Sequence, residues 1–242
     1  MKARSFIAIF AVIFLLAVCS GQMPRNEAYK ELASQYDTEA LNRFFTNAIL
    51  EREFSDSKDD NTVIKWTVPE ITYSIKGNPT AEHLAAIDEA LAQLAKIRGV
   101  PAITPVSDGG MIRIHVADDL AKQVLSSTLS TAFSVVSCDP EGSITDGRIC
   151  LAGSYETNDR LRHVVLEELL QTLGMENDTS EFTESITYQG VNDRTVLSTL
   201  DFAALECLYS DGIAAGMDKS EATEIIRSWI LKNIFNQSGV PQ

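Results

Sequence analysis

The residues of this chain that could do chemistry are concentrated between positions 167 and 177. Glu167 and Gln171 are one helical turn apart, Glu168 follows the first of them, and Gly174 and Asn177 complete the segment. Side chains four positions apart share one face of a helix, so Glu167 and Gln171 would point the same way. Such carboxylate and amide groups could form a polar network or hold a cation, and Glu168 could act as a general base.

The spacing matches the zinc-binding frame H-E-x-x-H-x-x-G-x-x-H, in which histidines hold the metal and the glutamate is the base. Glu167, Gln171 and Asn177 occupy the three ligand places. Gly174 occupies the glycine place, where a left-handed residue lets the chain leave the helix. Zinc prefers imidazole, thiolate and carboxylate ligands, so one carboxylate with two amides suits it poorly. The sequence therefore predicts no cofactor, without excluding zinc or another divalent cation.

His163 offers a second route to a metal site, because it lies one helical turn before Glu167. The two side chains could share a helix face and bind zinc together. The alternative is an ordinary helical histidine beside acidic residues.

The first 21 residues have the pattern of a signal peptide. Lys2 and Arg4 precede an unbroken apolar run, residues 6–18, which is too short to span a bilayer comfortably. Residues 16–19 resemble a bacterial lipoprotein box, in which Cys19 would carry the lipid, but Val18 stands where a small residue is usual. Ordinary cleavage near Ser20 is the alternative. We expect an exported protein of the periplasm or cell envelope, anchored to the membrane if Cys19 is lipidated.

Length and charge limit the other classes of function. The chain has 242 residues, of which 45% are hydrophobic, and a formal net charge of -14. This is enough apolar sequence for one folded domain. An acidic surface repels phosphate backbones, so we expect no nucleic-acid partner; an envelope protein or peptide is the expected partner.

Three cysteines follow the signal segment. Cys138 and Cys150 flank a predicted hairpin of strands at 131–137 and 148–153, and a disulfide between them would close a short loop. Cys207 lies among apolar residues at helical spacing and is expected to be a buried thiol. Pairing of Cys150 with Cys207 remains an alternative.

The remaining pattern predicts the order of elements. A helix at 37–51 and an acidic linker at 55–61 precede a strand at 71–75, a helix at 80–97 and a strand at 111–116. A short helical stretch at 119–125, the hairpin and the motif helix follow, and an amphipathic helix begins at Asp218. We therefore expect a signal peptide (1–21), an N-terminal helix with its linker (22–62), a main domain (63–217) and a C-terminal helix packed on it (218–242).

This order resembles the metzincin metalloproteases, and more closely a family of exported bacterial domains of unknown function. Residues 185–188, Ser-Ile-Thr-Tyr, are similar to the metzincin turn S-I-M-x-Y without its methionine. Residues 197–209 are similar to the later metzincin helix that begins L-S-x-x-D and ends in Leu-Tyr. Ser198, Asp201 and Tyr209 occupy the serine, aspartate and tyrosine positions of that pattern. Ser198 and Asp201 also fit a capping box. The resemblance implies an α+β fold, with a twisted mixed sheet, a helix before it, the motif helix behind it and C-terminal helices.

Three functional hypotheses follow. The preferred one is a degenerate metzincin-like domain with a non-catalytic binding or scaffolding role, in which Glu167, Glu168, Gln171 and Asn177 form a polar network in the cleft. The second is a peptidase or amidase with altered metal ligands and Glu168 as general base. The third is an unrelated α/β envelope lipoprotein that carries this spacing by chance.

Overall fold

The computed structural model describes residues 25–52, 62–117 and 132–236. The predicted signal peptide with Cys19, the predicted linker at 55–61 and the predicted helical stretch at 119–125 lie outside these residues. The described strands are β1 (Glu70–Gly77), β2 (Ala102–Pro105), β3 (Ile112–Val116), β4 (Ala132–Cys138) and β5 (Ile144–Leu151). The described helices are α2 (Arg25–Gln35), α3 (Thr38–Leu50), α4 (Ala81–Leu94), α6 (Asn158–Thr172), α7 (Thr199–Leu208), α8 (Lys219–Ile230) and the π-helix η1 (Leu231–Phe235).

The strands form one mixed sheet in the order β2-β1-β3-β5-β4. β2, β1, β3 and β5 run parallel, and β4 pairs with β5 in the antiparallel direction. The predicted mixed sheet is therefore confirmed. β4 occupies one end of the sheet because its hairpin turns the chain back along the outer side of β5.

Side chains alternate between the two faces of the sheet, and one face is buried. Ile71 on β1, Ile114 on β3 and Ile149 on β5 are almost inaccessible. α6 packs against β4 and β5 and also against α4. Gly147 marks the contact, because a methyl group at that position would lie 3.7 Å from the Thr172 side chain. The motif helix therefore covers the buried face beside the β4–β5 hairpin.

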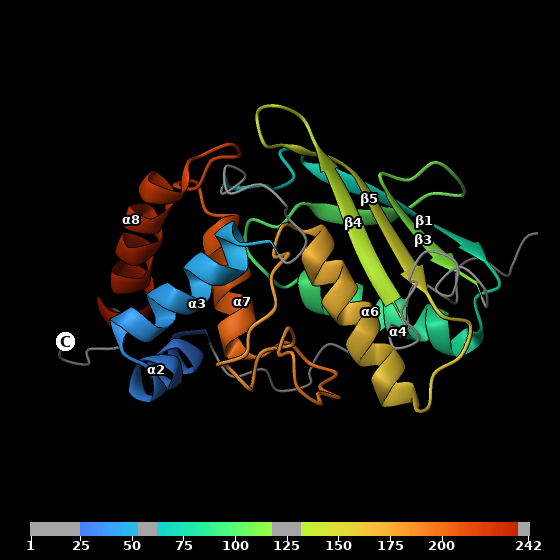
Figure 1. The fold of residues 1–242 in the computed structure, drawn as a ribbon, viewed down its shortest axis with the longest axis horizontal. Helices are drawn as coiled ribbons and strands as arrows, with labels where there is room; N and C mark the ends of the chain where they lie inside the picture. The colour runs from blue at the N-terminus through green and yellow to red at the C-terminus, as the bar shows by residue number, and fades with distance from the viewer. Residues whose placement is uncertain (1–24, 53–61, 118–131, 237–242) are drawn as a thin grey trace, which may run out of the picture.

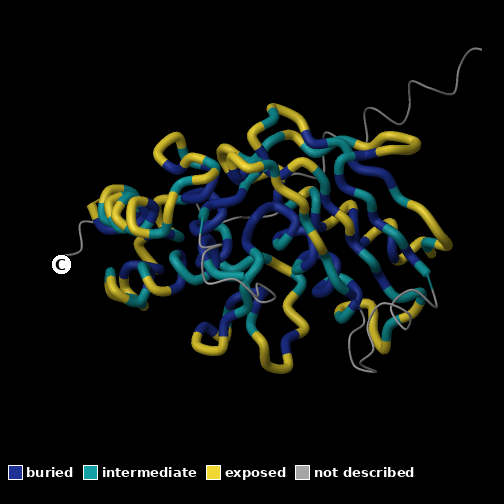
Figure 2. The backbone as a smooth tube through the Cα atoms, turned by 45° about the horizontal axis from the view of Figure 1, so that its top comes forward, coloured by how far each residue is buried: buried dark blue, intermediate teal, exposed yellow. Residues whose placement is uncertain are grey.

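The remaining helices form a second part of the molecule, away from the sheet (Figure 1). α3 packs on α8 and on α7, and the Phe45 ring lies 6.1 Å from that of Trp229. Buried backbone runs through the middle of both parts, while exposed segments lie at the turns and outer ends (Figure 2). None of the described helices is long and apolar enough to cross a membrane.

Local sequence explains where most helices begin. Thr80, Thr157, Ser198 and Asp218 are the N-caps of α4, α6, α7 and α8, and each accepts a backbone N–H bond in the first turn. Ser198 and Asp201 form the predicted capping box. These starts were predictable because a cap needs only residues that are close in sequence.

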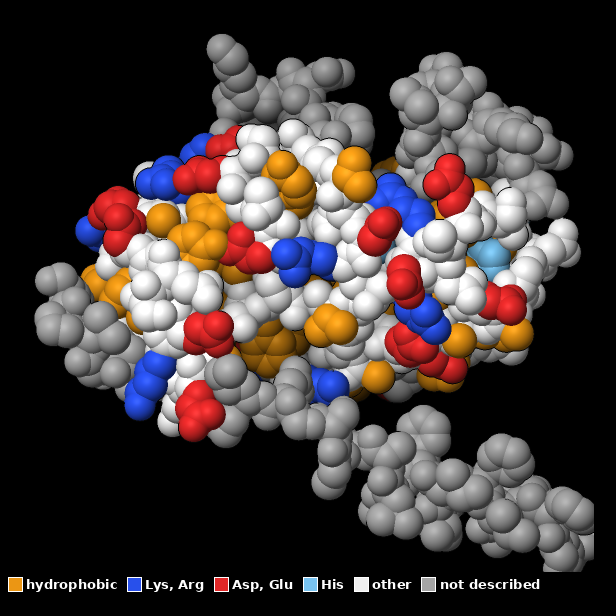
Figure 3. Space-filling view, turned by 90° about the horizontal axis from the view of Figure 1, so that it is seen from below, with side chains coloured by type: hydrophobic (Ala, Val, Ile, Leu, Met, Phe, Trp, Pro, Cys, Tyr) orange, Lys and Arg blue, Asp and Glu red, His pale blue; other side chains and the backbone are white. Residues whose placement is uncertain are grey.

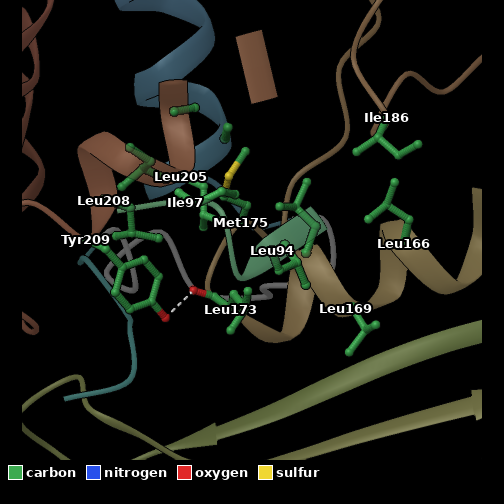
Figure 4. Close-up of a cluster of buried hydrophobic side chains, with 14 of the residues drawn as sticks. Leu94, Ile97, Leu166, Leu169, Leu173, Met175, Ile186, Leu205, Leu208 and Tyr209 are labelled. Carbon is green, nitrogen blue, oxygen red and sulfur yellow. Dashed lines mark hydrogen bonds between the residues drawn. The ribbon is translucent and has the colours of Figure 1, made fainter. Parts of the chain in front are cut away.

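The end of α6 is fixed by residues from distant segments. The Trp66 indole donates to the Thr172 carbonyl at 2.9 Å, and the Tyr209 hydroxyl donates to the Leu173 carbonyl at 3.0 Å. Figure 4 shows the second bond beside the apolar cluster between α4, α6 and α7. These donors satisfy carbonyls that a helix end leaves without partners. They hold the motif segment at the junction of the two parts.

Gly174 lies where the chain leaves α6, and steric constraints favour a glycine there. Its φ is +102°, a conformation that favours glycine, and a Cβ atom there would lie 2.3 Å from the Ile64 carbonyl oxygen. The left-handed exit predicted for this position is therefore present.

The predicted disulfide between Cys138 and Cys150 is wrong. Of the described cysteines, Cys138, Cys150 and Cys207 are all free, so the alternative pair of Cys150 and Cys207 is also not formed. The strand register gives the reason for the first pair: Cys138 lies opposite Ile144, whereas Cys150 lies opposite Phe133. The two thiols sit toward opposite ends of the hairpin. Residues near opposite ends of a hairpin are far apart, whereas a disulfide bond needs two cysteines whose Cβ atoms are neighbours.

α2 is a helix that the sequence pattern did not predict. Tyr29 on α2 donates to the buried carboxylate of Glu206 on α7 at 3.0 Å, and Arg25 pairs with the same carboxylate at 2.9 Å. Arg98 forms a third contact with it. Burial, and next the Glu206 charge, raise the pKa of the Tyr29 hydroxyl. α2 is therefore held by long-range bonds rather than by a strong apolar pattern of its own.

Candidate functional site

α6 presents the motif side chains to several different neighbours. Glu168 is buried, with 6% of its surface exposed. Its charge acts on two groups near the sheet: burial and, secondarily, Glu168 raise the pKa of the Cys150 thiol, and burial is also the main cause of a raised pKa at Tyr155, with Glu168 adding to it. The residue at the general-base position therefore lies inside the protein.

Glu167 contacts the histidine that precedes it by one turn. His163 Nε2 lies 3.5 Å from Glu167 Oε2, and His163 Nδ1 is bonded to the Arg194 carbonyl at 3.0 Å. Burial lowers the pKa of His163, and the bond to the carbonyl partly opposes this. The predicted shared face of His163 and Glu167 is present. His163 is also a buried residue that ties α6 to the segment before α7.

Gln171 links α6 to the outermost strand and to the next loop. Ser134 on β4 donates to Gln171 Oε1 at 2.8 Å, and Gln171 Nε2 donates to Asp178 Oδ1 at 3.4 Å. Asp178 is one residue beyond the third ligand place. The sequence pattern did not identify Ser134 or Asp178, because their approach to Gln171 depends on the pairing of β4 and on the turn at Gly174.

Asn177, at the third ligand place, is directed to the helical part of the molecule. Its side-chain amide donates to Asn47 Oδ1 on α3 at 2.9 Å. Glu167, Gln171 and Asn177 thus bond to three different partners: α6 itself, β4 with the following loop, and α3.

The residues at the ligand places do not fit the zinc centre that the metzincin frame implies. The Gln171 oxygen accepts from Ser134, and the Asn177 amide is used by Asn47. In the part of the chain that the structure describes, no three His, Cys, Asp or Glu side chains come together as a metal site. His163 and Glu167 are adjacent, but a closed zinc site in a protein uses more ligands than two.

The two downstream motifs meet at one buried carboxylate. Ser185 donates to Asp201 Oδ1 at 2.6 Å, and the Ile186 backbone N–H donates to Oδ2 at 3.0 Å. Ser198 donates to Oδ2 at 2.7 Å from its hydroxyl. Burial raises the pKa of Asp201, while these bonds act in the opposite direction. The 185–188 turn and the start of α7 are therefore joined through Asp201.

β4 is the other notable feature beside α6. Its sequence, Ala-Phe-Ser-Val-Val-Ser-Cys, contains no charged residue and no proline, and Val135 is 53% exposed. Edge strands in natural proteins are usually protected by charges, proline, bulges or a covering segment. The register shift of β4 comes only at Ser137 and Cys138, near its end. The absence of charge was visible in the sequence, but the position at the end of the sheet was not.

We define the edge site as the outer edge of β4 together with Gln171, Glu167 and Asp178 beside it. Ser134 places Gln171 against the strand, and Glu167 lies one turn earlier on the same helix face, with 17% of its side chain exposed. On the face seen from below, acidic and basic side chains are intermixed (Figure 3). Among the described strands, the edge site therefore combines the last strand of the sheet with two nearby carboxylates.

Comparison with known proteins places this chain in a family. No curated protein sequence matches it. The solved structure of myroilysin is similar over 61% of this chain and 82% of that protein, with a TM-score of 0.41 and 14% sequence identity. A family model described as "Protein of unknown function (DUF2927)" matches residues 38–228, from the start of α3 into α8. The chain therefore belongs to the DUF2927 family of proteins of unknown function.

Proposed function

We propose that this protein is a non-catalytic binding domain of the cell envelope that takes up an extended peptide segment of a partner protein along β4. The observation that carries the proposal is the uncharged strand at the end of the sheet. Such a strand can add one more strand through main-chain hydrogen bonds, and neighbouring side chains then select the sequence. The partner would be an envelope protein or peptide.

The arrangement of the motif residues supports binding over catalysis. Metzincin ancestry remains part of the proposal, since the Gly174 exit and the Asp201 bonds preserve the spacing of the frame. The ligand places, however, are used to join β4, α6 and α3. Residues that once could have faced a metal would now brace the strand that binds the peptide.

Export is also part of the proposal. The apolar run at 6–18 after Lys2 and Arg4 supports a signal peptide, and Cys19 supplies a lipid attachment point. A lipid anchor at the N-terminus would hold the edge site near the membrane surface, where it could meet other envelope proteins.

A library of linear peptides tests binding against catalysis. The protein without residues 1–21 is mixed with the library. The peptides that it retains are identified by mass spectrometry, and their masses show whether they are intact. We expect retained peptides to stay intact and Glu168→Gln protein to retain the same set. Peptides that are cut by the wild-type protein and left intact by Glu168→Gln would contradict the proposal and support the hydrolase hypothesis.

A further inference from the structure

The face of the sheet that α6 does not cover carries the alternate side chains of each strand. α6 packs on β4 and β5, and Ile114 and Ile149 point to that buried face. Arg113 on β3 and Arg148 on β5 therefore point to the opposite face, because side chains alternate along a strand. Their side chains are 39% and 66% exposed. We call this surface the outer face of the sheet.

Arg113 and Arg148 form a pair of like charges on the outer face. They lie directly opposite each other in the parallel register of β3 and β5. Arg113 Nη2 donates to Asp146 Oδ2 at 2.6 Å, and Arg148 Nε donates to the same oxygen at 3.2 Å. Like charges directly opposite each other destabilise a sheet, and a single carboxylate offsets only one of the two. Within this group of three side chains, one positive charge is therefore left over.

The two guanidinium groups retain hydrogen-bond donors. A guanidinium carries five N–H donors in one plane, and two of them in parallel match a carboxylate. The bonds to Asp146 use Nη2 of Arg113 and Nε of Arg148, and the other nitrogens of both groups make no hydrogen bond to another described residue. Arg113 and Arg148 can therefore bind an anionic group without losing their contact with Asp146.

Apolar side chains adjoin the guanidinium pair on β4. Val135 lies directly opposite Arg148 and is 53% exposed. Phe133 lies two residues earlier on the same face and is partly exposed. An inorganic anion would gain nothing from these two side chains, whereas a peptide could bury an aliphatic side chain against them. Charge and apolar surface together favour a peptide that contains acidic and aliphatic residues.

We infer that the outer face binds an acidic segment of a partner protein, in which a carboxylate meets Arg113 and Arg148 and a neighbouring aliphatic side chain covers Val135. The formal net charge of the chain is -14, so the protein as a whole repels an acidic peptide. Selection of such a peptide therefore requires a local group of cations. The inference goes beyond the proposed function, because this surface binds side chains and does not require a strand to pair with β4.

Fluorescence anisotropy with labelled synthetic peptides tests the inference. The probe is a short peptide of leucine and glutamate. In three comparison peptides, glutamine or lysine replaces the glutamate, or serine replaces the leucine. We expect the probe to bind at least about tenfold more tightly than each of them, a difference of about 1.4 kcal/mol, and to weaken as salt is added.

The comparison peptides state what would contradict the inference, and they require no protein variant. A glutamine or lysine peptide that binds as tightly as the probe would overturn it, because selection for acidic side chains would be absent. A serine peptide that binds as tightly as the probe would overturn the assignment of Val135, and the outer face would then be a site for simple anions.

Two variants should change the affinity for the probe in opposite directions. Arg148→Gln removes one guanidinium and should weaken binding at least about tenfold. Asp146→Asn removes the carboxylate that both arginines share and should strengthen binding, since both positive charges are then available. A folding defect would lower the affinity of both variants, so the opposite signs distinguish the charge effect from a loss of structure.

The ion pair of Arg43 with Glu181 supplies matched controls. Both side chains are more than half exposed, and Arg43 lies on α3, away from the sheet. Arg43→Gln and Glu181→Gln change the net charge as Arg148→Gln and Asp146→Asn do, and we expect neither to alter the affinity for the probe. Equal weakening by Arg43→Gln and Arg148→Gln would overturn the inference. Weaker binding by Asp146→Asn protein that is folded by circular dichroism would also overturn it.

Discussion

Ser134 of β4 donates a hydrogen bond to Gln171 of α6 at 2.8 Å. The bond joins the outermost strand to the residue at the second ligand place of a metal-binding frame. The frame position is thereby used to brace an edge strand. Asp178 extends the connection through its bond from Gln171 at 3.4 Å.

Loss of this bond should lower stability measurably. Ser134→Ala leaves the half-buried Gln171 oxygen without its donor on β4, and we expect the free energy of unfolding to fall by about 1 kcal/mol. Ser137→Ala is the matched control, because Ser137 is an exposed residue of the same strand. Chemical denaturation of the three proteins measures the difference. Equal stability of Ser134→Ala and wild type would show that the bond does not brace β4.

Gly174→Ala should be one of the most damaging small substitutions in the chain. The residue would need φ near +102°, and its methyl group would lie 2.3 Å from the Ile64 carbonyl oxygen. We expect a loss of at least about 2 kcal/mol in the free energy of unfolding. Gly109→Ala is the control: its φ is +68°, but nothing lies within 4 Å of the added atom. Its loss should be smaller, about 1 kcal/mol, and equal losses would argue against the clash at Gly174.

The part of the fold that was predictable is the part that local sequence controls. Thr80, Ser198 and Asp218 begin their helices as the capping pattern indicates, and Gly174 gives the left-handed exit from the motif helix that its place in the pattern indicates. α2 was missed because its anchor, Glu206, is 177 residues from Tyr29. The short strand β2 was also missed, since only four residues pair with β1.

The same distinction applies to the candidate site. Glu167 and His163 were predicted to meet because both lie on one helix, one turn apart. The partners of Gln171 and Asn177 could not be predicted, because Ser134 is 37 residues and Asn47 is 130 residues away. The error at Cys138 and Cys150 has the same origin: hairpin ends were predicted, but the register that separates the thiols was not.

The three described cysteines should differ in reactivity. Cys138 is an exposed residue, but the partial burial of its thiol and, secondarily, the Glu176 charge raise its pKa to about 11. We expect a thiol reagent near neutral pH to modify Cys138 slowly and before Cys207, which is fully buried in α7 and should react only after unfolding. Mass spectrometry of tryptic peptides under non-reducing conditions should show no linked pair. A bridge between Cys138 and Cys150 would contradict the register.

Glu176 should make stability depend on pH. Burial raises its pKa, and Arg52, 3.3 Å away, only partly opposes the shift. A carboxyl whose pKa is higher in the folded state favours folding at low pH, and this contribution is lost as pH rises through the folded-state pKa. Glu176→Gln removes the titration. We therefore expect the stability of Glu176→Gln relative to wild type to increase from acid to neutral pH. A relative stability that falls over this range would mean that the Arg52 ion pair outweighs burial.

The central claim is that β4 accepts another strand along its outer edge. Amide hydrogen exchange, followed by mass spectrometry as a peptide retained from the library is added, tests it most directly. The account predicts slower exchange at residues 132–137 when the peptide binds, with α8 unchanged as an internal reference. Binding of the peptide with unchanged exchange in β4, or with protection confined to other segments, would contradict it.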